Sequence, residues 1–99
     1  MPDDNTFLEL LRLRLRSARL AQNLRQEDVA ERTGMELRNY QRLESLTSRR
    51  RFNPTLLSLR ALANAIGISL SELLKDATPQ ELATLASAKG EVRTRARRN

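Results

Sequence analysis

Apolar residues recur at helical spacing along most of the chain and divide it into several short amphipathic segments. In the first segment this spacing is kept by Phe7, Leu11, Leu15 and Ala18. Thr6 and Glu9 have the S/T-x-x-E spacing of a capping box, and Gln22 and Asn23 follow the last apolar position. The pattern therefore predicts a first helix that begins at Thr6 and ends near Gln22.

Within this first helix, residues 12–16 read RLRLR, and such strict alternation would also suit a half-buried strand. Good helix formers flank the run on both sides and no turn residues bound it, which favours the helix. Three more leucines exceed the needs of one core-facing stripe, namely Leu8, Leu10 and Leu13. They either widen the buried face, which is the simpler interpretation, or cover a second surface such as that of a dimer partner.

Residues 26–43 contain two short helical patterns, one on each side of Gly34. Val29 and Ala30 form the apolar pair of the first pattern, and the apolar points of the second are Met35, Tyr40 and Leu43. Gly34 can end the first helix with a positive φ, and Ala30 is small enough for the two helices to cross closely. Two short helices joined in this way form a helix-turn-helix, which places its second helix in the major groove of DNA.

With its apolar residues turned to the core, the second helix of this pair directs its other side chains elsewhere. That set consists of Glu36, Leu37, Arg38, Asn39, Gln41 and Arg42. Side chains of these kinds can reach the bases or phosphates of DNA.

Two further helices are predicted in the second half of the chain. Asn53-Pro54-Thr55 begins one, Gly67 ends it, and its buried side is formed by Leu56, Leu59, Leu62, Ala63 and Ile66. Ser69 and Glu72 have the spacing of a capping box for a short fifth helix. Its apolar residues close the core, and they are Leu70, Leu73 and Leu74.

A sixth helix is predicted over about residues 79–88. Its start is signalled by Thr78-Pro79-Gln80-Glu81, and its apolar stripe is Leu82, Leu85 and Ala86. So short a helix is not stable alone in water, and it must pack on its own domain or on a second chain. Residues 89–99 carry a net charge of +4 without apolar periodicity, which indicates a disordered basic tail that either follows DNA or only aids solubility.

Several separated residues resemble one family of DNA-binding proteins. Gln26, Ala30, Gly34 and Glu44 stand where the XRE or lambda-repressor-like helix-turn-helix family has its Gln, Ala, Gly and Glu, and Arg19 matches the arginine of that family's first helix. Residues 53–74 resemble its fourth and fifth helices, so the resemblance covers roughly residues 11–74. It implies an all-α, five-helix DNA-binding domain, which we place at residues 6–75, with residues 76–99 as a C-terminal extension.

The resemblance also implies roles for single residues. Arg19 and Glu44 would pair and hold the recognition helix, and Gln26 would bind a phosphate. Bases would be read by Glu36, Leu37, Arg38, Asn39 and Gln41: Arg38 suits guanine, Asn39 or Gln41 adenine, Leu37 a thymine methyl group, and Glu36 cytosine unless it serves as a helix N-terminal charge. Further phosphate contacts are expected from Arg42, Arg49, Arg50 and Arg51.

Residues 45–52, SLTSRRRF, depart from the family pattern. Ser45 and Leu46 replace an Asn-Gly turn, and the loop before Asn53 is longer than usual. A leucine rarely adopts the positive φ of a glycine, so either the third helix continues or the turn takes another shape.

Composition narrows the possible partners and chemistry. The chain of 99 residues has 18 Lys and Arg against 12 Asp and Glu, a net charge of +6, which suits a polyanion such as double-stranded DNA better than a membrane. It contains no cysteine and no histidine, so we expect no disulfide, no metal, no cofactor and no enzymatic activity. Residues 1–6 are acidic and polar rather than a signal peptide, and a cytoplasmic protein of a bacterium or phage is expected.

Two functions remain open at this point. The favoured one is a transcriptional regulator, a repressor or autoregulatory controller, that binds an inverted repeat as a homodimer because one helix reads only a few base pairs. The alternative is an antitoxin-like or adaptor module whose C-terminal extension binds another protein, with DNA binding secondary. RNA binding is disfavoured, since three aromatic residues cannot build stacking platforms.

Overall fold

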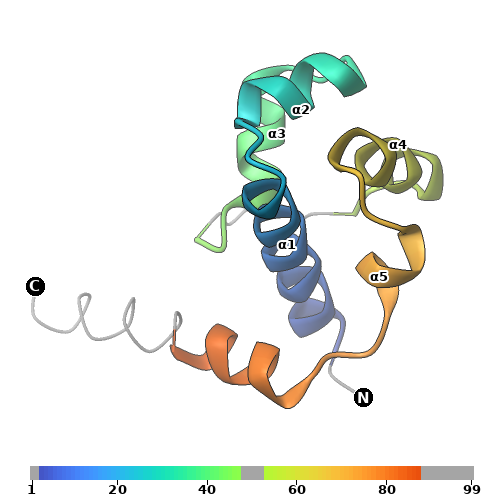
Figure 1. Cartoon of the computed structure of the whole chain (residues 1–99). Coiled ribbons are helices and arrows are strands. Elements are labelled where there is room, and N and C mark those ends of the chain that lie inside the picture. Colours follow the sequence, from blue (N-terminus) through green and yellow to red (C-terminus); the bar gives the residue numbers. More distant parts are fainter. Residues whose placement is uncertain (1–2, 48–52, 88–99) are drawn as a thin grey trace, which may run out of the picture.

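The computed structural model describes residues 3–47 and 53–87 of the chain, and all regular structure within them is helical (Figure 1). The labelled helices are α1 (Asp4–Ala21), α2 (Gln26–Thr33), α3 (Leu37–Glu44), α4 (Leu56–Ile66) and α5 (Leu70–Leu74). Residues 79–87 form a further, C-terminal helix. The predicted all-α fold is confirmed. The proposed basic tail and the arginines at positions 49–51 lie outside the described residues.

The start of α1 differs from the prediction. Asp3 is the N-cap, its side chain accepts a hydrogen bond from the Thr6 backbone N–H at 2.8 Å, and the helix begins at Asp4 rather than at Thr6. The backbone N–H groups of the first helical turn have no partner within the helix, and the Asp3 carboxylate accepts from one of them. Its negative charge also suits the positive end of the helix dipole. Residues 12–16 lie inside α1, so the rejection of a strand there was correct.

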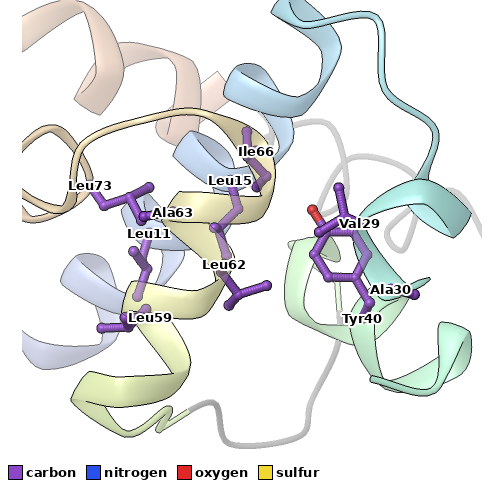
Figure 2. Close-up of a cluster of buried hydrophobic side chains, with 10 residues drawn as sticks. All are labelled: Leu11, Leu15, Val29, Ala30, Tyr40, Leu59, Leu62, Ala63, Ile66 and Leu73. Atoms are coloured by element: carbon purple, nitrogen blue, oxygen red, sulfur yellow. The ribbon is translucent and has the colours of Figure 1, made fainter. Parts of the chain in front are cut away.

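The core lies where α1, α2, α3 and α4 meet, and α5 closes it (Figure 2). Its buried members are Leu11, Leu15, Val29, Ala30, Tyr40, Leu59, Leu62, Ala63, Ile66 and Leu73. Leu10 is also buried, at 1% exposure, and Leu8 packs partly against the core. Two of the additional leucines of α1 therefore widen the buried face of a single chain.

The C-terminal helix is joined to α1 by Arg14, which is only 6% exposed. Its guanidinium donates two hydrogen bonds to the Glu81 carboxylate, at 2.9 and 3.0 Å. It also donates to the backbone carbonyls of Leu73, Lys75 and Asp76, which follow each other around the end of α5. Leu85 of the same helix is buried at 3% exposure. The C-terminal helix therefore packs on its own chain, at the end of α1 away from α2 (Figure 1).

The Arg14–Glu81 contact predicts a specific loss of stability in acid. Hydrogen bonding to Arg14 holds the pKa of the Glu81 carboxyl at about 2, below its usual 4.5. Because the folded-state pKa is depressed, the stabilisation is complete above pH 4.5 and is lost as the pH falls towards 2. We expect the difference in unfolding free energy between the wild type and Glu81→Gln to shrink across this range.

Urea unfolding at a series of pH values measures that difference. Glu72→Gln is the matched control, because Glu72 pairs with Lys75 at 2.9 Å on the surface and both side chains are about half exposed. Its effect should be small throughout. A difference for Glu81→Gln that stays constant from neutral pH down to pH 2 would contradict the assigned role of this carboxylate.

Candidate nucleic-acid interface

α2 and α3 are connected by a short turn that glycine makes possible. α2 ends at Gly34, whose φ of 74° lies in the left-handed region. The backbone N–H of Met35 then donates to the Ala30 carbonyl at 3.0 Å, which closes the end of the helix. Glu36 is the N-cap of α3 and has an extended backbone. Val29 and Ala30 are buried on α2, so its inner side faces the core.

α3 has one buried and one exposed side. Tyr40 is 0% exposed and Glu44 4%, while Met35 and Leu43 pack partly against the core. The residues predicted to read bases are all exposed: Glu36, Leu37, Arg38, Asn39 and Gln41. Arg42 is half-buried. Arg38 and Arg42 are four residues apart and therefore share one side of the helix, as do Leu37 and Gln41.

An ion pair fixes the last turn of α3 to α1. Arg19 donates from Nε to Glu44 Oε2 at 2.7 Å and from Nη2 to Glu44 Oε1 at 2.9 Å. Its Nη1 donates to the Leu24 carbonyl at 2.8 Å, so the same side chain also holds the segment before α2. The hydrogen bond to Glu44 raises the pKa of Arg19, and burial raises the pKa of the neighbouring Tyr40 hydroxyl. Both members of the pair are buried.

Gln26 extends this network to the exposed side of α3. Its Nε2 donates to Glu44 Oε1 at 3.3 Å, and its Oε1 accepts from Gln41 Nε2 at 3.4 Å. A chain of polar contacts therefore runs from Arg19 through Glu44 and Gln26 to Gln41. The amide nitrogen of Gln26 carries two hydrogens, and Glu44 takes one of them.

A hollow of about 330 Å³ opens beside this network. Its walls are formed by Arg16, Arg19, Gln26, Gln41, Glu44 and Ser45. Arg16 is exposed and comes from α1, so it adds a cation to a wall in which Arg19 and Glu44 neutralise each other. The sequence interpretation did not single out Arg16. Its one available signal was its place as the third arginine of the RLRLR run.

Within residues 3–47 and 53–87, no cluster of three or more His, Cys, Asp and Glu residues is arranged to hold a metal ion. None of the helices in the same ranges has the length and apolar character needed to cross a bilayer.

Comparison with known protein families gives a match. The sequence profile described as helix-turn-helix matches residues 15–73, from the middle of α1 to α5, which is more than half of the chain. No curated protein matches, and neither does any solved structure. The matched range contains both α2 and α3 and all the residues that line the hollow.

Proposed function

Because the chain belongs to the XRE, Cro and C1-type helix-turn-helix family of DNA-binding regulators, we propose that it recognises a specific DNA sequence by inserting α3 into the major groove. The observation that carries the proposal is the two-sided character of α3. Tyr40 and Glu44 hold one side of the helix in the core. The exposed residues are Glu36, Leu37, Arg38, Asn39 and Gln41. A helix fixed in this way can present several side chains to base edges at once.

Base reading is assigned to the exposed side chains of α3. Arg38 pairs with guanine O6 and N7, and Asn39 or Gln41 pairs with adenine. Leu37, 37% exposed, contacts a thymine methyl group. The bond between Gln41 and Gln26 supports a fixed orientation of the Gln41 amide before DNA arrives. Glu36, at the N-cap, either accepts from cytosine N4 or acts as a favourable charge at the helix start.

Phosphate binding is assigned to residues around this helix. Gln26 uses the hydrogen of its amide nitrogen that Glu44 does not take, and Arg42 acts from the last turn of α3. Arg49, Arg50 and Arg51 follow α3 in sequence and belong to the same set. Arg16 joins them, because it lines the hollow between α1 and the exposed side of α3. Such contacts fix the position of the protein and carry no direct sequence information.

The regulator acts as a homodimer on an inverted repeat. One recognition helix reads too few base pairs to select a site in a genome, so two copies must be spaced about 34 Å apart or a multiple of it. The same arrangement suits a repressor or a controller of its own operon. For an adaptor role of the C-terminal extension, residues 76–99, the structure offers less support, because Glu81 and Leu85 are already engaged within the chain.

Selection of bound sites from a random pool of DNA duplexes tests this function. Moderate salt is needed so that attraction between the +6 chain and phosphates does not dominate. We expect enrichment of an inverted repeat whose half-site spacing equals the distance between the two α3 helices. Folded protein that enriches no sequence would contradict the proposal and favour the protein-interaction function.

A further inference from the structure

The four helices from α2 to α5 end in two different ways. α2 and α4 end at Gly34 and Gly67, both with positive φ. α3 is followed by Ser45 with φ −81° and ψ 114°, and α5 by Lys75 with φ −63° and ψ 162°. Neither of these last two ends has the left-handed residue that usually helps to satisfy the final carbonyls. At the end of α3 the backbone N–H of Ser45 donates to the Arg42 carbonyl at 3.3 Å, and the other final carbonyls need donors from elsewhere.

For α3 a further donor comes from α1. Arg12 is 6% exposed, and its Nη1 donates to the carbonyl of Arg42, to that of Leu43 at 3.3 Å and to that of Ser45 at 3.2 Å. A guanidinium at this place satisfies the last carbonyls and lies at the negative end of the helix dipole. Arg12 therefore serves as the C-terminal cap of α3 from a different helix.

Arg12 and Arg19 hold the same turn of α3 at two points. They are about two turns apart on α1 and therefore lie on the same side of it. Arg12 binds the backbone of the last turn, whereas Arg19 binds the Glu44 side chain. Two attachments at different points restrain both the position and the rotation of α3 relative to α1, which one attachment would not.

We propose that Arg12 is a positioning residue for DNA recognition, which sets the orientation of α3 by capping its C-terminal end. The inference rests on the function proposed above. In this chain Arg12 takes over the task that a glycine performs at the ends of α2 and α4. It also accounts for the tolerance of Ser45 and Leu46 at the positions where the family resemblance implied an Asn-Gly turn.

Arg14 provides a matched control on the same helix. It is equally buried, at 6% exposure, and its guanidinium likewise donates to carbonyls at the end of a helix, those of Leu73 within α5 and of Lys75 directly after it. None of the proposed DNA contacts lies on α5 or the C-terminal helix. Loss of Arg14 should therefore weaken folding without changing how α3 meets DNA.

The test compares Arg12→Gln and Arg14→Gln with the wild type on the selected DNA duplex and on a scrambled one, at a temperature where circular dichroism shows each protein to be folded. We expect Arg12→Gln to lose about tenfold or more in affinity for the selected duplex and part of its preference over the scrambled one. Arg14→Gln should stay within about twofold of the wild type. In Arg12→Gln/Ser45→Gly, the glycine at the end of α3 should restore much of the lost affinity.

Equal affinity of the wild type and folded Arg12→Gln would overturn the inference, and so would an equal loss in Arg14→Gln. Should Arg12→Gln not fold, Arg12→Lys serves in its place, because it keeps the charge near the carbonyls but offers a less extended set of donors. It should show a smaller loss in the same direction, and wild-type affinity would overturn the inference. Absence of selective binding by the wild type itself would instead refute the proposed function, and the inference with it.

Discussion

Replacement of Glu44 by glutamine is expected to destabilise the domain by about 3–5 kcal/mol. The substitution removes the carboxylate that accepts two hydrogen bonds from Arg19, and it leaves that guanidinium buried at 8% exposure without a counterion. Gln26 also loses its charged acceptor. Since a small domain is stable by only about 5–15 kcal/mol, a large part of the population should unfold under mild denaturing conditions.

Urea unfolding measures this loss of stability. Two controls distinguish the effect of a buried unpaired charge from the effect of losing any carboxylate. Glu27→Gln removes an exposed carboxylate that lies 3.9 Å from Arg25, and it should change stability by less than about 1 kcal/mol. Arg19→Met/Glu44→Met removes both charges together and should recover most of the stability. A loss below about 1 kcal/mol for Glu44→Gln would show that the pair contributes no more than a surface ion pair.

Replacement of Arg38 by alanine is expected to abolish discrimination at one base pair of the selected site. The Arg38 side chain is exposed in the first turn of α3, where its guanidinium can form a bidentate pair with guanine. In the wild type, changing that base pair should cost about 1–3 kcal/mol in binding free energy. In Arg38→Ala the same change should have little effect. Competition binding with single-base-pair variants of the duplex measures both values.

Arg16→Ala is the matched control for Arg38→Ala. Arg16 is also exposed, but it comes from α1 and lines the hollow rather than the outer side of α3. Its loss should weaken binding to all duplexes by a similar factor. It should also reduce the slope of the logarithm of the binding constant against the logarithm of the salt concentration by about one. Arg50→Ala should behave in the same way. If Arg38→Ala and Arg16→Ala weaken all duplexes equally, the proposed division between base and phosphate contacts is wrong.

The sequence was sufficient to predict the helix-turn-helix and its two sides. Gly34 between two apolar patterns predicts the turn, and the spacing of Met35, Tyr40 and Leu43 predicts which side of α3 faces the core. These features depend on local spacing, which the sequence states directly. The assignment of the exposed residues to bases and phosphates stays a prediction, because it concerns contacts with DNA rather than contacts within the chain.

Two of the three buried arginines of α1, Arg12 and Arg14, could not be predicted in the same way. Arg12 and Arg14 belong to an alternating run, and charged side chains are rarely fully buried unless they are paired. Each is buried because it satisfies carbonyls at the end of a helix far away in sequence, Arg12 at α3 and Arg14 at α5. Such donors are chosen by tertiary packing, so spacing within α1 does not reveal them. The sequence did contain one clue, because Ser45 and Lys75 rather than glycines follow these two helices. A glycine there could close the helix end with its own backbone and would need no donor from another helix.

Chemical-shift mapping of backbone amides during titration with the selected duplex tests most directly whether α3 is the DNA-reading element. If α3 reads the DNA, the largest changes occur at Gln26 and over residues 37–42, and residues 79–87 are little affected. Largest changes over residues 79–87, with α3 unperturbed, would contradict it.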